Sequence, residues 1–329
     1  YYMKYGLGKG WMGILFAVLM IITFGFAYNS VQSNTICLAW QKAFGIEPAT
    51  MGIALTVLTL IIIFGGIQRV AKFSSTVVPV MAVVYLLIAV GVVVWNITSL
   101  PKVLLTIVEN AFGFNQAAGG VLGVTVIQGI KRGLFSNEAG EGSAPNAAAV
   151  ATVSHPVKQG LIQALGVFTD TLVVCSCTAF IILVSGVDVT ASNGIQLTQN
   201  ALTHEIGSIG NPFVAVMIWL FAFSSIIGNY YYGETNVRYI KDSKLGVFLY
   251  RLAVAAMVMV GAVVSLDFAW SFADITMALL TLCNLLAIVL LSRQAVFLLQ
   301  DYRQQKKEGK NPVFTKSKMP EIADKLEAW

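Results

Sequence analysis

The chain has 329 residues, of which 57% are hydrophobic and only 11% are charged, and its formal net charge is +5 at pH 7. A soluble core of this size cannot bury so much apolar surface, so the composition excludes an ordinary water-soluble globular protein and indicates a membrane protein. The four cysteines lie in apolar runs, where they behave as small hydrophobic side chains, and two histidines do not supply a histidine-based metal site.

Uncharged windows long enough to cross a bilayer recur along the whole chain. A helix needs about 20 apolar residues for this, and about eight such spans are predicted. They lie at 11–35, 49–68, 76–97, 120–152, 160–185, 210–233, 246–266 and 270–292. Segments 98–119 and 186–209 are predicted as outside loops, the first with a surface helix. The sequence therefore predicts an all-α, multi-pass integral membrane protein.

Basic residues show on which side of the membrane the loops lie. They precede the first span, follow the second, fourth and sixth spans and recur in the tail, whereas the opposite loops carry only Lys42 and Lys102. By the positive-inside rule, both ends of this chain are predicted to be cytoplasmic, in the cell inner (plasma) membrane. Residues 1–300 are predicted to form the transmembrane domain. Residues 301–329 are predicted to form a solvated cytoplasmic tail, with contact to lipid headgroups as the alternative.

The first span, 11–35, contains a small polar cluster of Tyr28, Asn29 and Gln32. Tyr28 and Gln32 are four residues apart and share a helix face. Hydrogen bonding between helices and contact with a substrate are both consistent with this cluster.

The fourth span cannot be one uninterrupted helix. Residues 136–145 read SNEAGEGSAP and place two carboxylates, two glycines and a proline at its centre. Proline lacks an amide donor and clashes with the preceding turn. An interrupted backbone at membrane depth is tolerated only where protein buries it or where it lines a cavity. We interpret the segment as a mid-membrane helix break, and a polar loop at the membrane surface is the alternative.

A helix break of this kind suits a zwitterionic ligand. The second half-helix, from about Ser143, would present its amide groups to a carboxylate, and the carbonyls of the first would face an ammonium group or a cation. Ala139, Gly140, Gly142 and Ala144 are small enough to let the backbone approach a ligand closely. Lys131 and Arg132 are predicted near the outer end of the first half-helix or in a re-entrant loop.

Three separated stretches, in order, resemble the alanine/glycine:cation symporters, the sodium:alanine symporter family. They are KRGLFSNEAGEGSAP at 131–145, QALGVFTDTLVVCSCT at 163–178 and FSSIIGNYYYGE at 223–234. The resemblance covers essentially the whole chain and implies a LeuT-type fold of two inverted five-helix repeats, with the predicted spans as core helices 3–10. Because the first two core helices have no counterpart and the chain does not begin with Met, we expect it to be truncated at its N-terminus and inactive alone.

The resemblance also implies a function and a set of site residues. The function is secondary active symport, in which sodium influx drives uptake of alanine or glycine by alternating access, with sodium as the coupling ion and no cofactor. Ser224 and Ser225 would form part of the sodium site, although two serines in an apolar span more often hydrogen-bond to a carbonyl of the preceding turn. Asn229 stands where some family members carry a tryptophan that narrows the pocket. The predicted substrate-binding residues are Ser136, Asn137, Glu138, Ala139, Gly140, Gly142, Ser143 and Asn229.

Several alternatives remain open from the residues alone. Protons are the alternative coupling ion, with Glu138, Glu141 or Asp170 as the carrier. An intramembrane enzyme would use Glu138 and Glu141 as an acid–base pair, but the sequence has no HExxH set, phosphate loop or nucleophile with a base partner. A channel is the third alternative, and no nucleic-acid or protein partner is inferred.

Three acidic residues, Asp170, Glu234 and Asp274, lie in or beside the spans, where an ionisable residue indicates a functional role. Asp170 is expected to support the break, to relay a proton or to pair with Lys131 or Arg132. For Glu234 and Asp274, marking a helix end is the alternative to a functional role.

Overall fold

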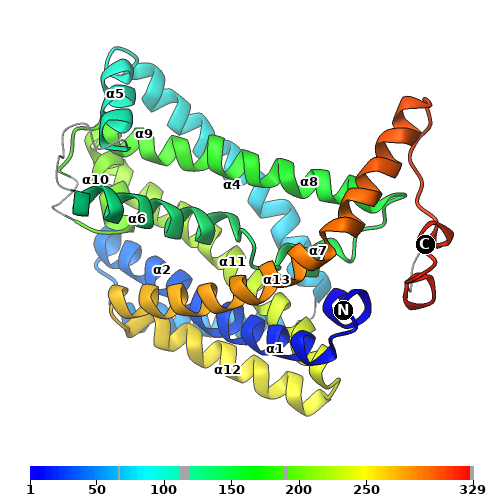
Figure 1. Cartoon of the computed structure of the whole chain (residues 1–329). Helices are drawn as coiled ribbons and strands as arrows, with labels where there is room; N and C mark the ends of the chain where they lie inside the picture. The colour runs from blue at the N-terminus through cyan, green and yellow to red at the C-terminus, as the bar shows by residue number, and fades with distance from the viewer. Residues whose placement is uncertain (66, 112–118, 189–191, 327–329) are drawn as a thin grey trace.

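The computed structural model describes residues 1–65, 67–111, 119–188 and 192–326, and every regular element in these ranges is a helix. Figure 1 shows their arrangement. The elements are η1 (Tyr2–Gly6), α1 (Gly10–Met20), η2 (Ile21–Tyr28), α2 (Asn29–Phe44), α3 (Pro48–Phe64), α4 (Ile67–Trp95), α5 (Leu100–Ala111), α6 (Gly119–Asn137), α7 (Ala144–Ala148), α8 (Pro156–Thr169), η3 (Asp170–Cys175), α9 (Ser176–Val184), α10 (Ile195–Ile206), η4 (Gly207–Ile209), α11 (Gly210–Ile240), α12 (Lys244–Val263), α13 (Leu266–Lys307), η5 (Lys316–Lys318) and η6 (Ala323–Lys325).

Several of these elements join into continuous helices long enough to cross a membrane. Among the described residues there are 5 such helices, at Gly10–Phe44, Pro156–Val184, Ile195–Ile240, Lys244–Val263 and Leu266–Lys307. The pair Pro79–Trp95 and Leu100–Glu109, bent by 101°, raises the number to 6 if it forms one span. The all-helical membrane architecture is thus confirmed. The count of about eight spans, which also includes α3 and the interrupted α6, stays a prediction.

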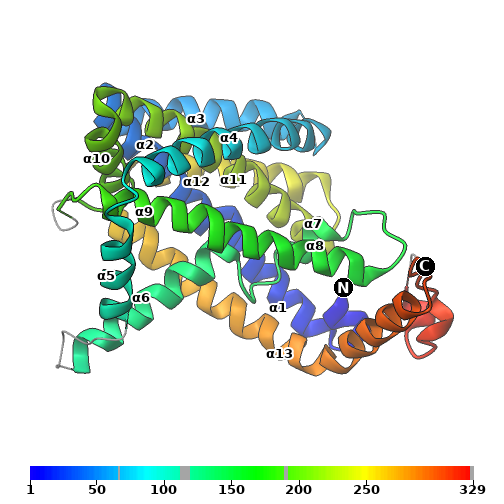
Figure 2. The same cartoon turned by 90° about the horizontal axis from the view of Figure 1, so that it is seen from above.

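Helices α2, α3, α11 and α12 enclose one hydrophobic cluster, in which Ile36, Leu55, Phe223 and Val258 are buried. A second cluster joins η1, α1 and η2 to α13. Figure 1 shows α1, α2, α12 and α13 on one side of α6 and α8–α9 on the other, and Figure 2 shows α5 lying across the end of the other helices. Helix α6 therefore runs beside both groups and ends at the predicted break.

Helices α2 and α12 approach each other closely because Gly261 has no side chain. A Cβ on Gly261 would lie 2.5 Å from Cα of Ser30. Polar side chains of α2 then reach carbonyls of the neighbouring helix: Ser33 donates to the carbonyl of Val258 at 2.6 Å, and Asn34 donates to that of Gly261 at 3.0 Å. In lipid the hydrophobic effect does not drive helices together. Close packing at small residues and interhelical hydrogen bonds stabilise their association instead.

The C-terminal segment packs on the protein, although the sequence predicted a solvated tail. Phe314 donates its amide to the carbonyl of Ser154 at 2.8 Å, and the Ser154 hydroxyl donates to the carbonyl of Pro312 at 2.9 Å. Lys318 contacts Asp301 at 2.7 Å, and Asp301 also lies 3.2 Å from the buried His155. The segment is thereby attached to the connection between α7 and α8.

Candidate functional site

The predicted helix break is present between α6 and α7. Helix α6 ends at Asn137 and α7 begins at Ala144. Between them the backbone enters the left-handed region three times, at Glu138 (φ 49°), Gly140 (φ 78°) and Gly142 (φ 80°). Glycine accepts this conformation without steric cost, which explains why the sequence places two glycines here. The expected second half-helix is shorter than predicted, because α7 has only 5 residues.

The turn between the two helices is half-buried at 138–140 and buried at 141–143, and α13 holds it from one side. Gly142 leaves no room for a side chain, since a Cβ there would lie 2.8 Å from Cζ of Phe16 and 2.9 Å from Cγ of Asn284. The Asn284 amide donates to the carbonyl of Gly140 at 2.8 Å, and its oxygen accepts from the Tyr2 hydroxyl at 2.5 Å. One asparagine of α13 thus connects the turn to the N-terminal helix η1.

Helix α11 holds the other end of the turn through Asn146. The Asn146 amide donates to the carbonyl of Gly142 at 3.0 Å, and its oxygen accepts from the amide of Asn236 at 3.1 Å. The carbonyls of Gly140 and Gly142 in the break are therefore satisfied by the asparagine side chains of α13 and α7, which reduces the cost of an interrupted backbone in a membrane.

Glu141 lies at the centre of the turn and is fully buried. Its Oε1 accepts a hydrogen bond of 2.7 Å from the Tyr28 hydroxyl, whereas its Oε2 is buried without a hydrogen-bond partner among the described residues. Tyr28 packs against the rings of Phe24 and Phe135. This contact confirms hydrogen bonding between helices as a role for Tyr28.

The basic residues of α6 face α13 and pair with Asp274. Arg132 contacts both oxygens of Asp274, at 2.6 and 2.8 Å, and Lys131 approaches it to 3.4 Å. The Arg132 guanidinium also lies over the ring of Trp270, with 4.0 Å to the ring centroid. The alternative that Asp274 marks a helix end was wrong, because it lies inside α13 and forms an ion pair there.

Two other acidic residues also have partners that the sequence did not reveal. Asp170, at the start of η3, accepts from the Ser136 hydroxyl at 2.6 Å instead of pairing with Lys131 or Arg132. Glu234 lies inside α11 and forms ion pairs with Arg238 and Arg251, so it does not mark a helix end either.

A cavity of about 340 Å³ opens beside the break. The predicted residues Ser136, Asn137 and Glu138 line it, together with Asp170 and, from α11, Tyr232. Thr171 donates to the side-chain oxygen of Asn137 at 2.8 Å, which orients that amide. The remaining lining residues are small or apolar, apart from Gln163: Ala144, Ala147, Ala164, Gly166 and Val167. The cavity therefore combines two carboxylates, two amides and an apolar wall.

Other residues of the predicted turn do not line this cavity. Gly140 and Gly142 face α13, and the Ser143 hydroxyl donates to Glu138. Tyr232 was not predicted from the sequence as a site residue, although it lies three residues beyond the predicted site residue Asn229 in the same polar stretch of α11. Helical spacing alone gives no rule for choosing between them, because residues three apart share a face.

Asn229 and the two predicted sodium ligands lie along α11. Asn229 is buried and donates to the side-chain oxygen of Asn29 at 3.2 Å. The hydroxyls of Ser224 and Ser225 donate to the carbonyl of Phe221 at 2.7 and 3.1 Å. This is the local hydrogen bonding expected of serines in an apolar helix, and a sodium-binding role for both residues stays a prediction.

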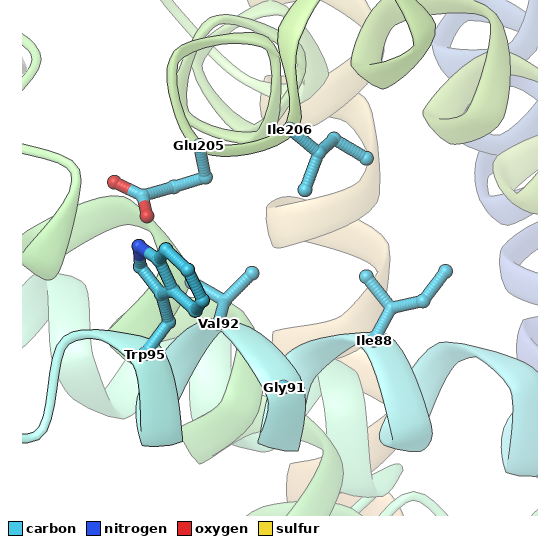
Figure 3. A pocket seen from close by; sticks show the side chains of 6 residues that line it. All are labelled: Ile88, Gly91, Val92, Trp95, Glu205 and Ile206. Carbon is cyan, nitrogen blue, oxygen red and sulfur yellow. The ribbon is translucent and has the colours of Figure 1, made fainter.

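A second cavity, of about 410 Å³, lies between α4 and α10 and contains none of the predicted site residues. Figure 3 shows Ile88, Gly91, Val92 and Trp95 on one helix facing Glu205 and Ile206 on the other, with the Glu205 carboxylate pointing toward the indole of Trp95. Glu205 accepts a hydrogen bond of 2.5 Å from Asn96. This cavity has one carboxylate, already hydrogen-bonded, in a mostly apolar lining, so the cavity at the break is the better candidate for a zwitterionic ligand.

Comparison with known proteins shows the family of the chain. A sequence model of the sodium:alanine symporter family matches residues 1–316. The chain is 54% identical over 317 residues to a probable sodium/glutamine symporter of Bacillus subtilis, covering 96% of this chain and 66% of that protein. It is 37% identical over 317 residues to a sodium/proton-dependent alanine carrier protein of Bacillus sp. PS3, covering 91% of this chain and 71% of the relative.

A third relative is archaeal. The chain is 36% identical over 313 residues to a sodium/alanine symporter of Methanococcus maripaludis, covering 93% of this chain and 68% of the relative. The chain thus spans about two thirds of the length of the curated relatives it matches.

Proposed function

The chain belongs to the sodium:alanine symporter family, a family of transporters and not of enzymes, and on this premise we propose that it is a secondary active symporter for small neutral amino acids. Sodium influx drives uptake of alanine and glycine by alternating access. The observation that carries the proposal is the buried break at 138–143, which meets the cavity lined by Ser136, Asn137 and Glu138. Broken helices beside a cavity are where transporters of this type bind amino acids and ions.

The lining of the cavity supports a zwitterion with a short side chain. The carboxylates of Glu138 and Asp170 suit an ammonium group, and the Asn137 amide is oriented by Thr171 and offers a donor to a carboxylate. Because α7 has only 5 residues, these side chains and the backbone of the turn contribute more than a helix dipole does. Ala139, Gly140, Gly142 and Ser143 contribute by shaping the turn, and Asn229, which donates to Asn29, contributes by fixing α11 against the first helix.

The coupling ion and the fold are proposed from the family. Ser224 and Ser225 supply hydroxyl oxygens to a sodium site when they leave the carbonyl of Phe221, since a hard cation takes oxygen ligands. The fold is of the LeuT type, with the predicted spans as core helices 3–10 and both ends of this chain in the cytoplasm of a multi-pass plasma-membrane protein.

The identity of the substrate and the identity of the coupling ion are tested together with the proposal. One relative is named as a sodium/glutamine symporter and another as a sodium/proton-dependent alanine carrier, so glutamine as substrate and protons as an additional coupling ion are the second candidates. Uptake of radiolabelled alanine by the full-length protein in proteoliposomes, with sodium and pH gradients imposed separately, distinguishes the ions. Competition by unlabelled glycine, alanine and glutamine ranks the substrates.

The expected result is alanine accumulation that requires an inward sodium gradient. Asn137→Ala should weaken it strongly, whereas Asn311→Ala, the same change in the C-terminal tail, should not. Ser224→Ala and Ser225→Ala should raise the sodium concentration needed for half-maximal uptake. They should raise the alanine concentration needed for half-maximal uptake by a smaller factor. Uptake that is indifferent to sodium would contradict the proposal.

A further inference from the structure

Glu141 is the least satisfied carboxyl group at the helix break. Its side chain is fully buried, Oε1 has one hydrogen bond of 2.7 Å from Tyr28, and Oε2 is buried without a partner among the described residues. Glu138, three residues earlier, differs because it lines the cavity and accepts from Ser143. The two acids of one turn therefore have different surroundings, one at the cavity and one behind it.

A charged carboxylate is poorly accommodated in the surroundings of Glu141. None of the ion pairs among the described residues includes Glu141, and the two basic residues nearest in sequence, Lys131 and Arg132, both pair with Asp274. An ionised carboxylate in a low-dielectric interior needs a cation or several donors, and a single hydroxyl does not replace its hydration. A neutral carboxylic acid has no charge to solvate, and its Oε1 still accepts from Tyr28.

The titratable groups around Glu141 supply no positive charge. Tyr28 of η2 donates to Oε1, Glu138 of the same turn is a second acid, and the two cations of α6, Lys131 and Arg132, are both paired with Asp274 of α13. Tyr2 of η1, bonded to Asn284, and Tyr232 of α11, beside the cavity, carry no positive charge in either protonation state. The side chains that close the turn around it, Phe16 and Asn284, are uncharged. Gly142, the next residue, is closely packed, since a Cβ there would lie 2.8 Å from Phe16 and 2.9 Å from Asn284, and a proton is the smallest cation that can neutralise Glu141.

We propose that Glu141 is a proton-binding site, with Oε1 as the carbonyl oxygen that accepts from Tyr28 and Oε2 as the atom that carries the proton. The acid forms when the carboxylate takes a proton at Oε2, and it releases that proton when the turn 138–143 opens to water. As a part of transport this rests on the proposed function, because protons would then enter together with substrate and sodium. The location of the proton at Oε2 does not depend on transport.

Infrared difference spectroscopy of the purified protein tests that location directly. A protonated carboxyl group has a C=O stretching band that a carboxylate lacks. The band is expected in the wild type at neutral pH and should be absent in Glu141→Gln. In Tyr28→Phe it should remain but move to higher frequency, because the carbonyl loses its hydrogen bond. The Tyr28 variant keeps the test valid even if Glu141→Gln fails to fold. A band that is unaffected by both substitutions would overturn the proposal.

Transport measurements test the exchange of the proton. A gradient of one pH unit across the membrane changes the equilibrium accumulation ratio of a substrate carried with one proton about tenfold. Alanine accumulation in proteoliposomes is therefore measured at a clamped membrane potential with acid outside, and each protein is normalised to its own accumulation without a pH gradient. The wild type should gain about tenfold per pH unit, and Glu141→Gln should gain nothing. Glu205→Gln, the same change at the second cavity between α4 and α10, is the matched variant and should keep the gain.

The two experiments separate this proposal from the proposed function. If the wild type takes up no alanine with sodium, the proposed function fails, and the infrared band still decides whether Glu141 binds a proton. If sodium drives uptake but the pH response is lost in Asp170→Asn and kept in Glu141→Gln, the proton site lies at Asp170 and this inference is wrong.

Discussion

Gly142 is the position where a single methyl group should most clearly disturb the helix break. Its φ of 80° is in the left-handed region, and the Cβ of an alanine would lie 2.8 Å from Phe16 and 2.9 Å from Asn284. The left-handed conformation costs an L-residue about 1–2 kcal/mol, and inserting a methyl group into packed surroundings costs about 1–3 kcal/mol more. Gly142→Ala should therefore reduce the free energy of unfolding by about 2–5 kcal/mol.

Gly45 provides the matched control for this substitution. It ends α2 with a φ of 68°, and nothing lies within 4 Å of the Cβ that alanine would add. Gly45→Ala should thus show the conformational cost of about 1–2 kcal/mol without the clash. Thermal unfolding in detergent and alanine uptake in proteoliposomes are compared for both variants at one pH and sodium concentration. Equal stability of the two variants, or wild-type uptake by Gly142→Ala, would refute the reasoning.

Three further substitutions test the contacts around the break and the tail. Asn284→Ala leaves a turn carbonyl and the Tyr2 hydroxyl without a protein partner, so it should destabilise by about 1–3 kcal/mol and more than Tyr2→Phe in the same thermal assay. Arg132→Lys keeps the charge but loses the contact with both oxygens of Asp274 and the stacking on Trp270. It should lower uptake, and because Arg132 is partly exposed, the loss of stability should be at most about 1 kcal/mol. Wild-type uptake would contradict this. Lys318→Met should release the C-terminal segment and speed its cleavage by chymotrypsin, whereas Lys316→Met should not.

The helix break was predictable because its causes are local. Glycine, proline and carboxylates within residues 136–145 are incompatible with an apolar helix in any fold, so the sequence reveals the interruption without knowledge of its neighbours. The same holds for the long helices, which follow from apolar windows. Helix ends outside the apolar windows were less predictable. The first helix continues beyond its apolar window to Phe44, and α13 continues beyond its window to Lys307. A helix does not need apolar side chains once it has left the apolar part of the membrane.

The partners of the polar and charged side chains in the helices could not be predicted from sequence. Tyr28 and Glu141 are 113 residues apart, and Arg132 and Asp274 are 142 residues apart. Such pairs depend on which faces of two helices meet, and hydrophobic periodicity is weak in spans that are apolar on all sides. For the same reason Asp274 and Glu234 looked like helix ends, although both lie inside helices and form ion pairs.

The docked C-terminal segment shows that composition alone does not reveal whether a polar tail packs on the protein. Its composition is polar and mixed in charge, which is typical of a solvated tail. A few specific contacts, among them Phe314 with Ser154 and Lys318 with Asp301, attach it to the loop after α7. Composition averages over such contacts, so a short docked segment and a free tail have the same signature.

The contacts of Gly142 and Asn284 imply that the two positions do not act independently. The Asn284 side chain supplies one of the two surfaces that a methyl group on Gly142 would meet, at 2.9 Å, and it also holds the carbonyl of Gly140. Removing it in Asn284→Ala should therefore relieve part of the clash in Gly142→Ala. The double variant should be less destabilised than the sum of the single variants, by a coupling energy of about 0.5–3 kcal/mol. Gly142→Ala combined with Lys318→Met, at the tail, should be additive. Additivity in both pairs would mean that Asn284 of α13 does not restrain the turn. The close packing at Gly142 would then not limit opening of the turn 138–143.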